Sequence, residues 1–182
     1  MNFSKTKKLV LSAMFLALGI LLPLLVGHLF PMGWILLPMH VPVLLCGFIC
    51  GGPWGLLVGA VTPLLSSVIT GMPGLYPSAV AMAFELAAYG LLAGLFYGLF
   101  PKNIAFIFVS LILAMIGGRI VWSLVSLALY GIAGTAFTWG DIFGGAVVMV
   151  FPGIIIQLVL IPAIMIALQL TQKKKRSQPE AA

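Results

Sequence analysis

The sequence predicts an all-α integral membrane protein, a bundle of six transmembrane helices with both termini in the cytoplasm. Of the 182 residues, 63% are hydrophobic and only 7% are charged, and the mean hydropathy is +1.26. A soluble domain carries roughly 25% charged residues, so this chain cannot cover a water-facing surface. Its apolar residues also gather in six segments, and about 20 such residues suffice for a helix to cross a bilayer. The composition excludes an ordinary cytosolic enzyme and a disordered protein.

The six segments are separated by residues that are typical of helix ends and turns. The segments cover approximately residues 9–26, 35–50, 54–70, 79–99, 104–131 and 142–170. The breaks between them carry Gly33, Gly51-Gly52-Pro53, Gly71-Met72-Pro73-Gly74, Pro101-Lys102-Asn103 and Gly140-Asp141.

The first segment follows three lysines, as the apolar core of a secretory signal also does. That core is only about 7–15 residues long and is followed by an A-x-A site, whereas this segment is longer and no such site follows it. We therefore expect a first span that stays in the protein. Its residues Ala13 and Ala17 form an AxxxA face, which lets another helix approach closely in lipid.

The second and third segments are short and contain Pro38, Pro42 and Pro63. They predict either two full spans or a re-entrant pair, and both versions leave the termini on the same side. Backbone that is broken at membrane depth must line a cavity or be covered by protein. Both versions therefore predict a site nearby, and His40, near the outer start of the second segment, is a candidate for it. A histidine can also simply hydrogen-bond a neighbouring carbonyl.

The fourth segment carries Glu85 within AMAFELAAYG, six residues from Ala79 at its outer end. A charged residue inside a membrane is costly and needs a reason. Glu85 either pairs with Arg119 of the fifth segment to fix helix packing, or contacts a polar ligand. A run of small residues at four-residue spacing, which includes Gly90 and Gly94, predicts close packing, either inside the protein or against another subunit.

The fifth segment has a polar and aromatic stripe. Its members follow the spacing i, i+3, i+4, i+7, i+11, which places them on one helix face: Arg119, Trp122, Ser123, Ser126 and Tyr130. Such a face predicts the wall of an inward cavity, where aromatic rings stack on a flat ligand and polar groups bind its edges. The alternative is hydrogen bonding between helices by the serines.

Weaker signals come from the remaining elements. Thr62, Ser66 and Thr70 share one face of the third segment, and Gln157 lies in the middle of the sixth. In the loop at 71–78, Tyr76 lies between prolines, and this loop is a candidate lid over an outer pocket.

The basic residues orient the protein. They flank the apolar segments at Lys5, Lys7, Lys8, Lys102 and the run Lys173, Lys174, Lys175, Arg176. The connections near 27–34, 71–78 and 132–141 contain no lysine or arginine, which is the positive-inside pattern. The net charge of +6 therefore reflects orientation in the lipid bilayer, and we expect no nucleic acid as a partner. We predict one membrane domain over residues 1–172 and a basic cytoplasmic tail over 173–182.

The chain lacks the sequence motifs that are typical of metal binding, redox chemistry and catalysis. The two histidines and two cysteines share no metal-ligand spacing, so we expect no metal and no cofactor. Cys46 and Cys50 form CxxxC, not the redox motif CxxC, and we interpret them as packing residues. No G-x-S-x-G and no phosphate-binding loop occurs, so we expect no catalytic residues and no hydrolysis of ATP by this chain.

Four stretches of the chain carry a resemblance to a known family. They are SAMFLALGILLP, LPMHVPVLLCGFICG, GLLVGAVTPLLSSVITGMPGLYPSAVAMAFELAAYG and LILAMIGGRIVWS. With the six-segment layout, they resemble the substrate-binding S components of energy-coupling factor (ECF) transporters, which take up vitamins in bacteria. The resemblance covers nearly the whole chain, and LPMHVPVLL together with AMAFELAAYG is its most specific part.

The resemblance implies a function that is not enzymatic. An S component in the bacterial cell membrane captures a water-soluble vitamin from outside and docks on an ECF module, a membrane coupling subunit with two ATPases. ATP hydrolysis then topples the S component, which releases the vitamin inside. In this family the AxxxA face of the first helix contacts the coupling subunit, which implies that role for Ala13 and Ala17. The pocket lies in the outer half, which agrees with the placement of Glu85, Tyr89 and the stripe of the fifth segment.

The resemblance leaves the vitamin open. Pantothenate, or a ring like that of pyridoxine or hydroxymethylpyrimidine, suits a pocket with one acid, one arginine and aromatic rings, and cobalamin suits it less. Arg119 fits a carboxylate, and Glu85 fits a ring nitrogen or an amine. The alternatives are a stand-alone carrier or channel and a small intramembrane enzyme.

Overall fold

The helices follow the predicted segments. The structure, a computed structural model, describes residues 3–30, 33–101, 103–132, 140, 144 and 151–177. Its described residues form α-helices and short helical turns and contain no strand, which confirms the predicted all-α class. The elements are α1 (Lys5–Leu29), η1 (Gly33–Leu36), α2 (His40–Cys50), α3 (Gly52–Thr70), η2 (Leu75–Ala79), α4 (Val80–Leu99), α5 (Ile104–Ile132) and α7 (Phe151–Ser177).

Five of these helices are long and apolar enough to cross a membrane, and they are α1, α3, α4 with the preceding η2, α5 and α7. The second predicted segment is different, because its helix α2 has only 11 residues. The chain first forms η1, then passes Leu37 at a φ of 51°, and α2 begins only at His40. A left-handed φ is rare outside glycine and marks a constrained backbone. The break in the backbone thus lies directly beside a candidate site residue.

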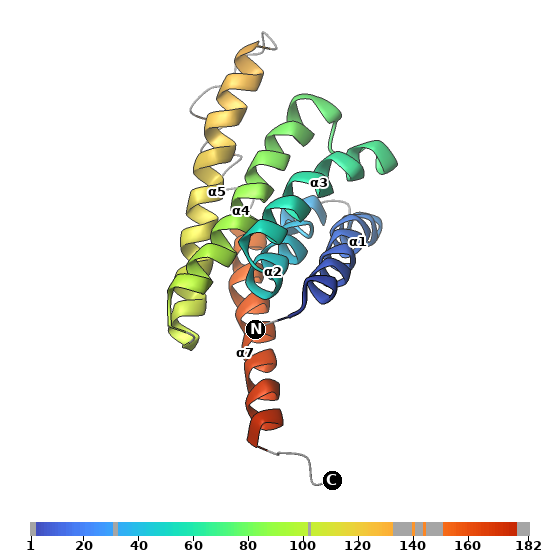
Figure 1. The fold of residues 1–182 in the computed structure, drawn as a ribbon. Coiled ribbons are helices and arrows are strands. Elements are labelled where there is room, and N and C mark those ends of the chain that lie inside the picture. The colour runs from blue at the N-terminus through green and yellow to red at the C-terminus, as the bar shows by residue number, and fades with distance from the viewer. Residues whose placement is uncertain are drawn as a thin grey trace.

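The helices form two layers (Figure 1). The first layer is a row in which α5, α4, α3 and α1 each contact the next. Helix α2 packs on this row against α1, α3 and α4, and α7 packs against α5, η1 and α2. Every residue of α2 except Ile49 is buried, so this short helix forms the centre of the protein. Many large apolar side chains of the other helices point outward, as expected of a surface that lipid covers.

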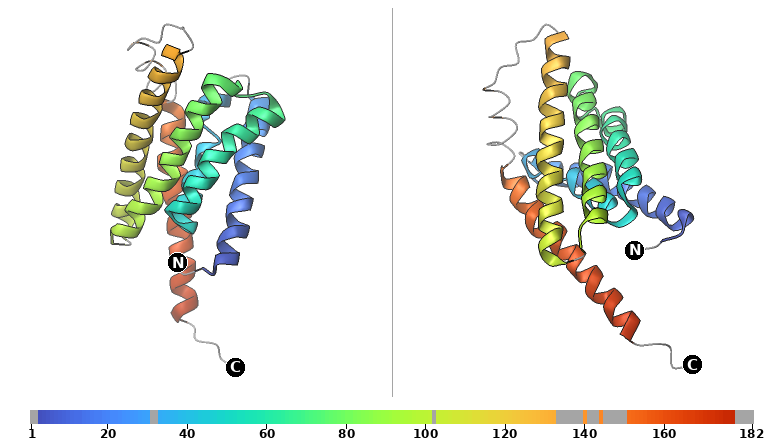
Figure 2. Two further views of the ribbon diagram at one scale, coloured as in Figure 1. Left: turned by 45° about the horizontal axis from the view of Figure 1, so that its top comes forward. Right: turned by 60° about the vertical axis from the view of Figure 1, so that its left-hand side comes forward.

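The beginning of α1 and the end of α7 lie at the same end of the bundle (Figure 2). This agrees with an even number of passes. Helix α7 continues beyond Gln172 to Ser177, so the basic run lies on the last turns of a helix. The first residues of the sixth predicted segment, apart from Gly144, lie outside the described residues.

Glycines bring α3 and α4 into close contact. A Cβ added at Gly90 of α4 would overlap the backbone of Gly55 of α3, and one at Gly55 would overlap Gly90. Gly94 lies equally close to the backbone of Gly52, whereas a Cβ at Gly98 would meet nothing within 4 Å. Small residues allow such close approach of helix backbones in lipid. Gly90 and Gly94 therefore pack inside the protein and do not form a free docking face.

Two further glycines end helices where the sequence predicted breaks. Gly51 follows α2 with a φ of 101°, and Gly71 follows α3 with a φ of 74°. Only glycine adopts these angles readily, because it has no Cβ.

Candidate functional site

Three ionisable side chains from three helices meet inside the bundle. Arg119 Nη1 of α5 lies 2.9 Å from Glu85 Oε1 of α4, and His40 Nε2 of α2 lies 3.7 Å from the same oxygen. His40 and Glu85 are each 1% exposed, whereas the side chain of Arg119 is 17% exposed. We refer to His40, Glu85 and Arg119 as the charged cluster. The pairing of Glu85 with Arg119, one of the two roles considered from the sequence, is present in this structure.

Two aromatic rings flank the charged cluster. Tyr89, one helical turn after Glu85, packs edge-on against His40 with 5.3 Å between the ring centroids. Gly118 of α5 makes room for Tyr89, because a Cβ there would overlap the tyrosine ring. Trp122 lies under the guanidinium of Arg119, whose Cζ is 5.8 Å from the ring centroid. At this distance a cation attracts the face of an indole ring.

The charged cluster contains buried polar atoms that no described residue satisfies. Both ring nitrogens of His40, and Nε and Nη2 of Arg119, lack a hydrogen-bond partner within the described part of the chain. Glu85 Oε1 is close to Arg119 but is not aligned for a hydrogen bond with it. Leaving a buried polar group without a hydrogen bond costs about 1–3 kcal/mol. A polar ligand that satisfied these atoms would therefore bind favourably.

Helix α7 contributes a further polar side chain that the sequence marked only weakly. Gln157 is fully buried, and both atoms of its amide lack a partner among the described residues. One turn before it, Gly153 packs against the backbone of Ile35 and Leu36 in η1, and one turn after it, Ile161 lies in the hydrophobic core. Gln157 thus faces the interior at the level where η1 leads into α2. Its position in the middle of a span was visible in the sequence, but its orientation was not.

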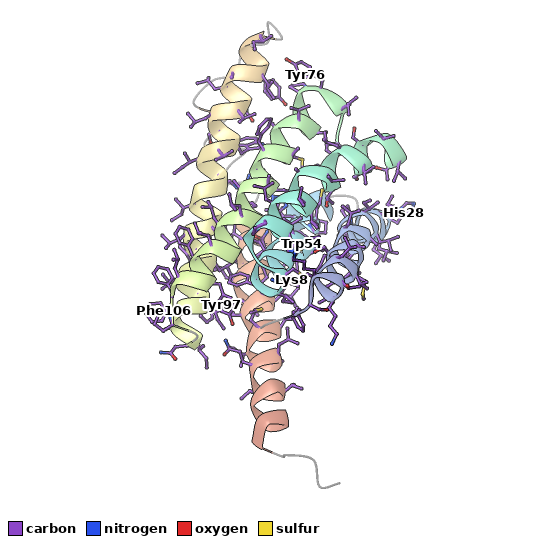
Figure 3. All side chains as sticks on the ribbon, viewed as in Figure 1. Lys8, His28, Trp54, Tyr76, Tyr97 and Phe106 are labelled. Atoms are coloured by element: carbon purple, nitrogen blue, oxygen red, sulfur yellow. The ribbon has the colours of Figure 1, made fainter. Side chains whose placement is uncertain are left out.

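Hydrogen bonds join the loop before α4 to the C-terminal part of α5. The hydroxyl of Tyr76 donates to the carbonyl of Leu129 at 3.2 Å, and the hydroxyls of Ser78 and Tyr130 are 3.2 Å apart. Tyr76 lies at the end of the bundle opposite Tyr97 and Phe106 (Figure 3). The loop therefore lies across the end of the α4–α5 pair, which is the place of the lid considered from the sequence.

The other predicted polar residues have different positions. Ser126 is fully buried, and its hydroxyl lacks a partner among the described residues, while Ser123 is half-buried. On α3 the side-chain hydroxyls donate hydrogen bonds to backbone carbonyls. Thr62 donates to the carbonyl of Val58, and Ser66 and Thr70 donate to that of Met72. This α3 face thus stabilises its own helix and the following turn.

The small residues Ala13 and Ala17 of α1 are both exposed. Helix α1 instead packs inward through Ser12, whose Oγ lies 3.6 Å from Cys46 Sγ, and through Gly19, which lies against Thr62. The AxxxA face is therefore open on the outside of the bundle. Cys46 and Cys50 are buried, unbridged core residues.

Among the residues that the structure describes, no three His, Cys, Asp or Glu side chains are grouped so that they could hold a metal ion.

Comparison with known families identifies the chain. The family model described as the ECF transporter, substrate-specific component, matches residues 7–173. The chain belongs to this family. No curated protein and no solved structure matches it. The resemblance of the four sequence stretches is thereby confirmed.

Membership of the family fixes the general role of this S component. It is a multi-pass protein of the cell membrane that binds a substrate for transport, and it is not an enzyme. Its partners are the transported substrate and an ECF module.

Proposed function

We propose that this S component captures a water-soluble vitamin or vitamin precursor from outside the cell and passes it to an ECF module for ATP-driven uptake. Pantothenate and a pyridoxine- or hydroxymethylpyrimidine-like ring are the preferred substrates, and cobalamin fits less well. The observation that carries the proposal is the charged cluster with its unsatisfied polar atoms, buried beside the break before α2.

The substrate is held by residues from four helices. Glu85 and Arg119 bind its polar groups, His40 and Tyr89 form one wall, and Trp122 stacks on it. Ser123, Ser126 and Tyr130 extend this surface toward the outer end, where Tyr76 closes the loop over it. We add Gln157 of α7 to this set because its buried amide lacks a partner among the described residues. Buried polar groups need hydrogen bonds, and a bound vitamin supplies them.

The docking partner is the membrane coupling subunit, which contacts Ala13 and Ala17. Their exposure on α1 supports this role, because small residues let the helix of a partner approach closely. The termini face the cytoplasm, where the two ATPases act. The lysines before α1 and on the last turns of α7 favour this orientation.

The proposal is tested by binding in detergent with the purified chain alone. Tryptophan fluorescence is followed while pantothenate, pyridoxine, hydroxymethylpyrimidine and cobalamin are added in turn. We expect saturable binding of one of them at about one ligand per chain, with the ligand recovered unchanged. Failure of all four to bind would contradict the proposed substrates.

A further inference from the structure

The guanidinium of Arg119 uses only one of its edges inside the protein. Nη1 faces Glu85 at 2.9 Å, whereas Nε and Nη2 are buried and lack a hydrogen-bond partner within the described residues. These two nitrogens form the side edge of the guanidinium, and their N–H groups point in nearly parallel directions. Two parallel N–H groups match the two oxygens of a carboxylate or of a phosphate group.

The neighbours of Arg119 hold this edge in place. Glu85 fixes the Nη1 end, and Trp122 lies against the flat face of the guanidinium. The arginine is therefore already oriented, so a ligand need not order a long side chain in order to bind. Preorganisation of this kind raises affinity, because less conformational entropy is lost on binding.

Charge balance separates a carboxylate from a phosphate. Arg119 and Glu85 carry opposite charges that cancel, so a ligand carboxylate adds a single negative charge to the charged cluster. A phosphate dianion would add two, and uncompensated charge in a buried, membrane-embedded site is costly. A neutral ligand, in turn, would leave the Arg119 edge without an ionic partner.

We propose that the Nε–Nη2 edge of Arg119 is a carboxylate-binding subsite and that the transported substrate is a small monocarboxylic acid. The inference rests on the proposed function and makes it more specific, because it selects pantothenate over the ring compounds. The carboxylate displaces the side chains that shield the edge, while the ion pair between Arg119 and Glu85 stays in place.

The test compares two ligands that differ only at the acidic group. Pantothenate carries a carboxylate, and pantothenol carries an alcohol at the same position. Both are titrated into the purified full chain by calorimetry, alongside neutral pyridoxine and hydroxymethylpyrimidine. We expect pantothenate to bind at least about 10- to 100-fold more tightly than pantothenol, which is the range for hydrogen bonds to a charged group.

Arg119→Lys tests the edge itself, because lysine keeps the charge beside Glu85 but lacks two parallel donors. We expect this variant to lose about tenfold or more of its pantothenate affinity and a smaller part of its pantothenol affinity, because an alcohol cannot accept two parallel N–H groups as a carboxylate does. Arg176→Lys, in the basic run at the end of α7, is the matched control and should change neither affinity.

The outcomes separate the two proposals. Binding of pyridoxine or hydroxymethylpyrimidine but not of pantothenate overturns the carboxylate subsite and leaves the vitamin-binding function standing. Equal affinities for pantothenate and pantothenol, or full affinity for pantothenate in Arg119→Lys, also overturn the subsite alone. Absence of binding by every compound in the panel contradicts the proposed substrates themselves. If Arg119→Lys does not fold, the comparison of pantothenate with pantothenol on the unchanged chain decides.

Discussion

A single carboxylate oxygen, Glu85 Oε1, faces both Arg119 and His40 inside the bundle. A buried ion pair can serve packing, ligand binding or both, and the static geometry is the same in each case. The two roles differ in what happens when both charges are removed together. A neutral pair preserves packing, because neither partner is left as an unpaired buried charge.

We therefore predict different results for single and double substitutions of this pair. Glu85→Gln leaves the charge of Arg119 unpaired and should destabilise the protein by about 3–5 kcal/mol. Glu85→Gln combined with Arg119→Gln should regain much of the thermal stability in detergent but remain at least about tenfold weaker in ligand binding, since each charged hydrogen bond contributes about 1.5–3 kcal/mol. Recovery of full ligand affinity in the double variant would reduce the pair to a packing role.

Gln157 offers a second test at the scale of one residue. Gln157→Leu replaces a buried amide without described partners by an apolar group of similar size. We expect the midpoint of thermal unfolding to rise or stay unchanged, because the cost of an unsatisfied amide disappears. Ligand affinity, measured by fluorescence titration, should fall about tenfold. Unchanged affinity would remove Gln157 from the binding set.

At the scale of the element, the contact between α3 and α4 depends on glycine. Gly90→Ala should separate the two helices, because the new Cβ would overlap the backbone of Gly55. We expect a loss of about 1–3 kcal/mol of stability, which is typical of overpacking, and weaker ligand binding, since α4 also carries Glu85. Gly98→Ala on the same helix is the control. Its Cβ would meet nothing within 4 Å, so the midpoint temperature of thermal unfolding should stay unchanged or rise slightly. Equal effects of the two substitutions would contradict this account of the interface.

Helix α1 allows docking to be separated from binding. Ala13→Leu and Ala17→Leu enlarge an exposed face that contacts no part of the charged cluster. We expect each to abolish uptake by cells that contain the ECF module, while ligand binding in detergent stays within about twofold, because surface changes away from a site have small effects. Ala163→Leu, at an exposed position of α7, should leave both unchanged. Normal uptake in the Ala13 and Ala17 variants would exclude docking through this face.

Most helices could be predicted from the sequence alone. Hydropathy and turn residues predicted α1, α3, α4 and α5 to within a few residues, because lipid requires long apolar segments and glycine ends them sterically. The sixth segment was predicted to end at residue 170, whereas α7 runs to Ser177. The second segment differed in another way. Its prolines suggested irregular backbone, but only the structure places the start of α2 at His40.

The site was less accessible from the sequence for a physical reason. The spacing of Arg119, Trp122 and Ser126 predicted a shared helix face, yet it could not say which helix would lie opposite. Contacts between helices depend on their rotation and depth, which are set by packing at positions such as Gly55 and Gly90. For this reason the pairing of Glu85 with Arg119 remained one of two alternatives, and the inward orientation of Gln157 was not predicted.

At the scale of the whole molecule, the chain is a substrate-binding subunit with no phosphate-binding loop of its own. Capture and transport should therefore be separable. We expect the bundle alone to hold its ligand, whereas moving the ligand against a gradient requires energy from the ATPases of the module.

The most direct test of this account measures vitamin uptake by proteoliposomes that hold the chain alone or the chain with the coupling subunit and both ATPases. The vitamin is the one that binds in detergent. We predict that the chain alone binds about one ligand per chain and accumulates none, and that the complete assembly accumulates the vitamin only with ATP inside the compartment that corresponds to the cytoplasm. Accumulation by the chain alone, without ATP, would contradict the account and favour a stand-alone carrier.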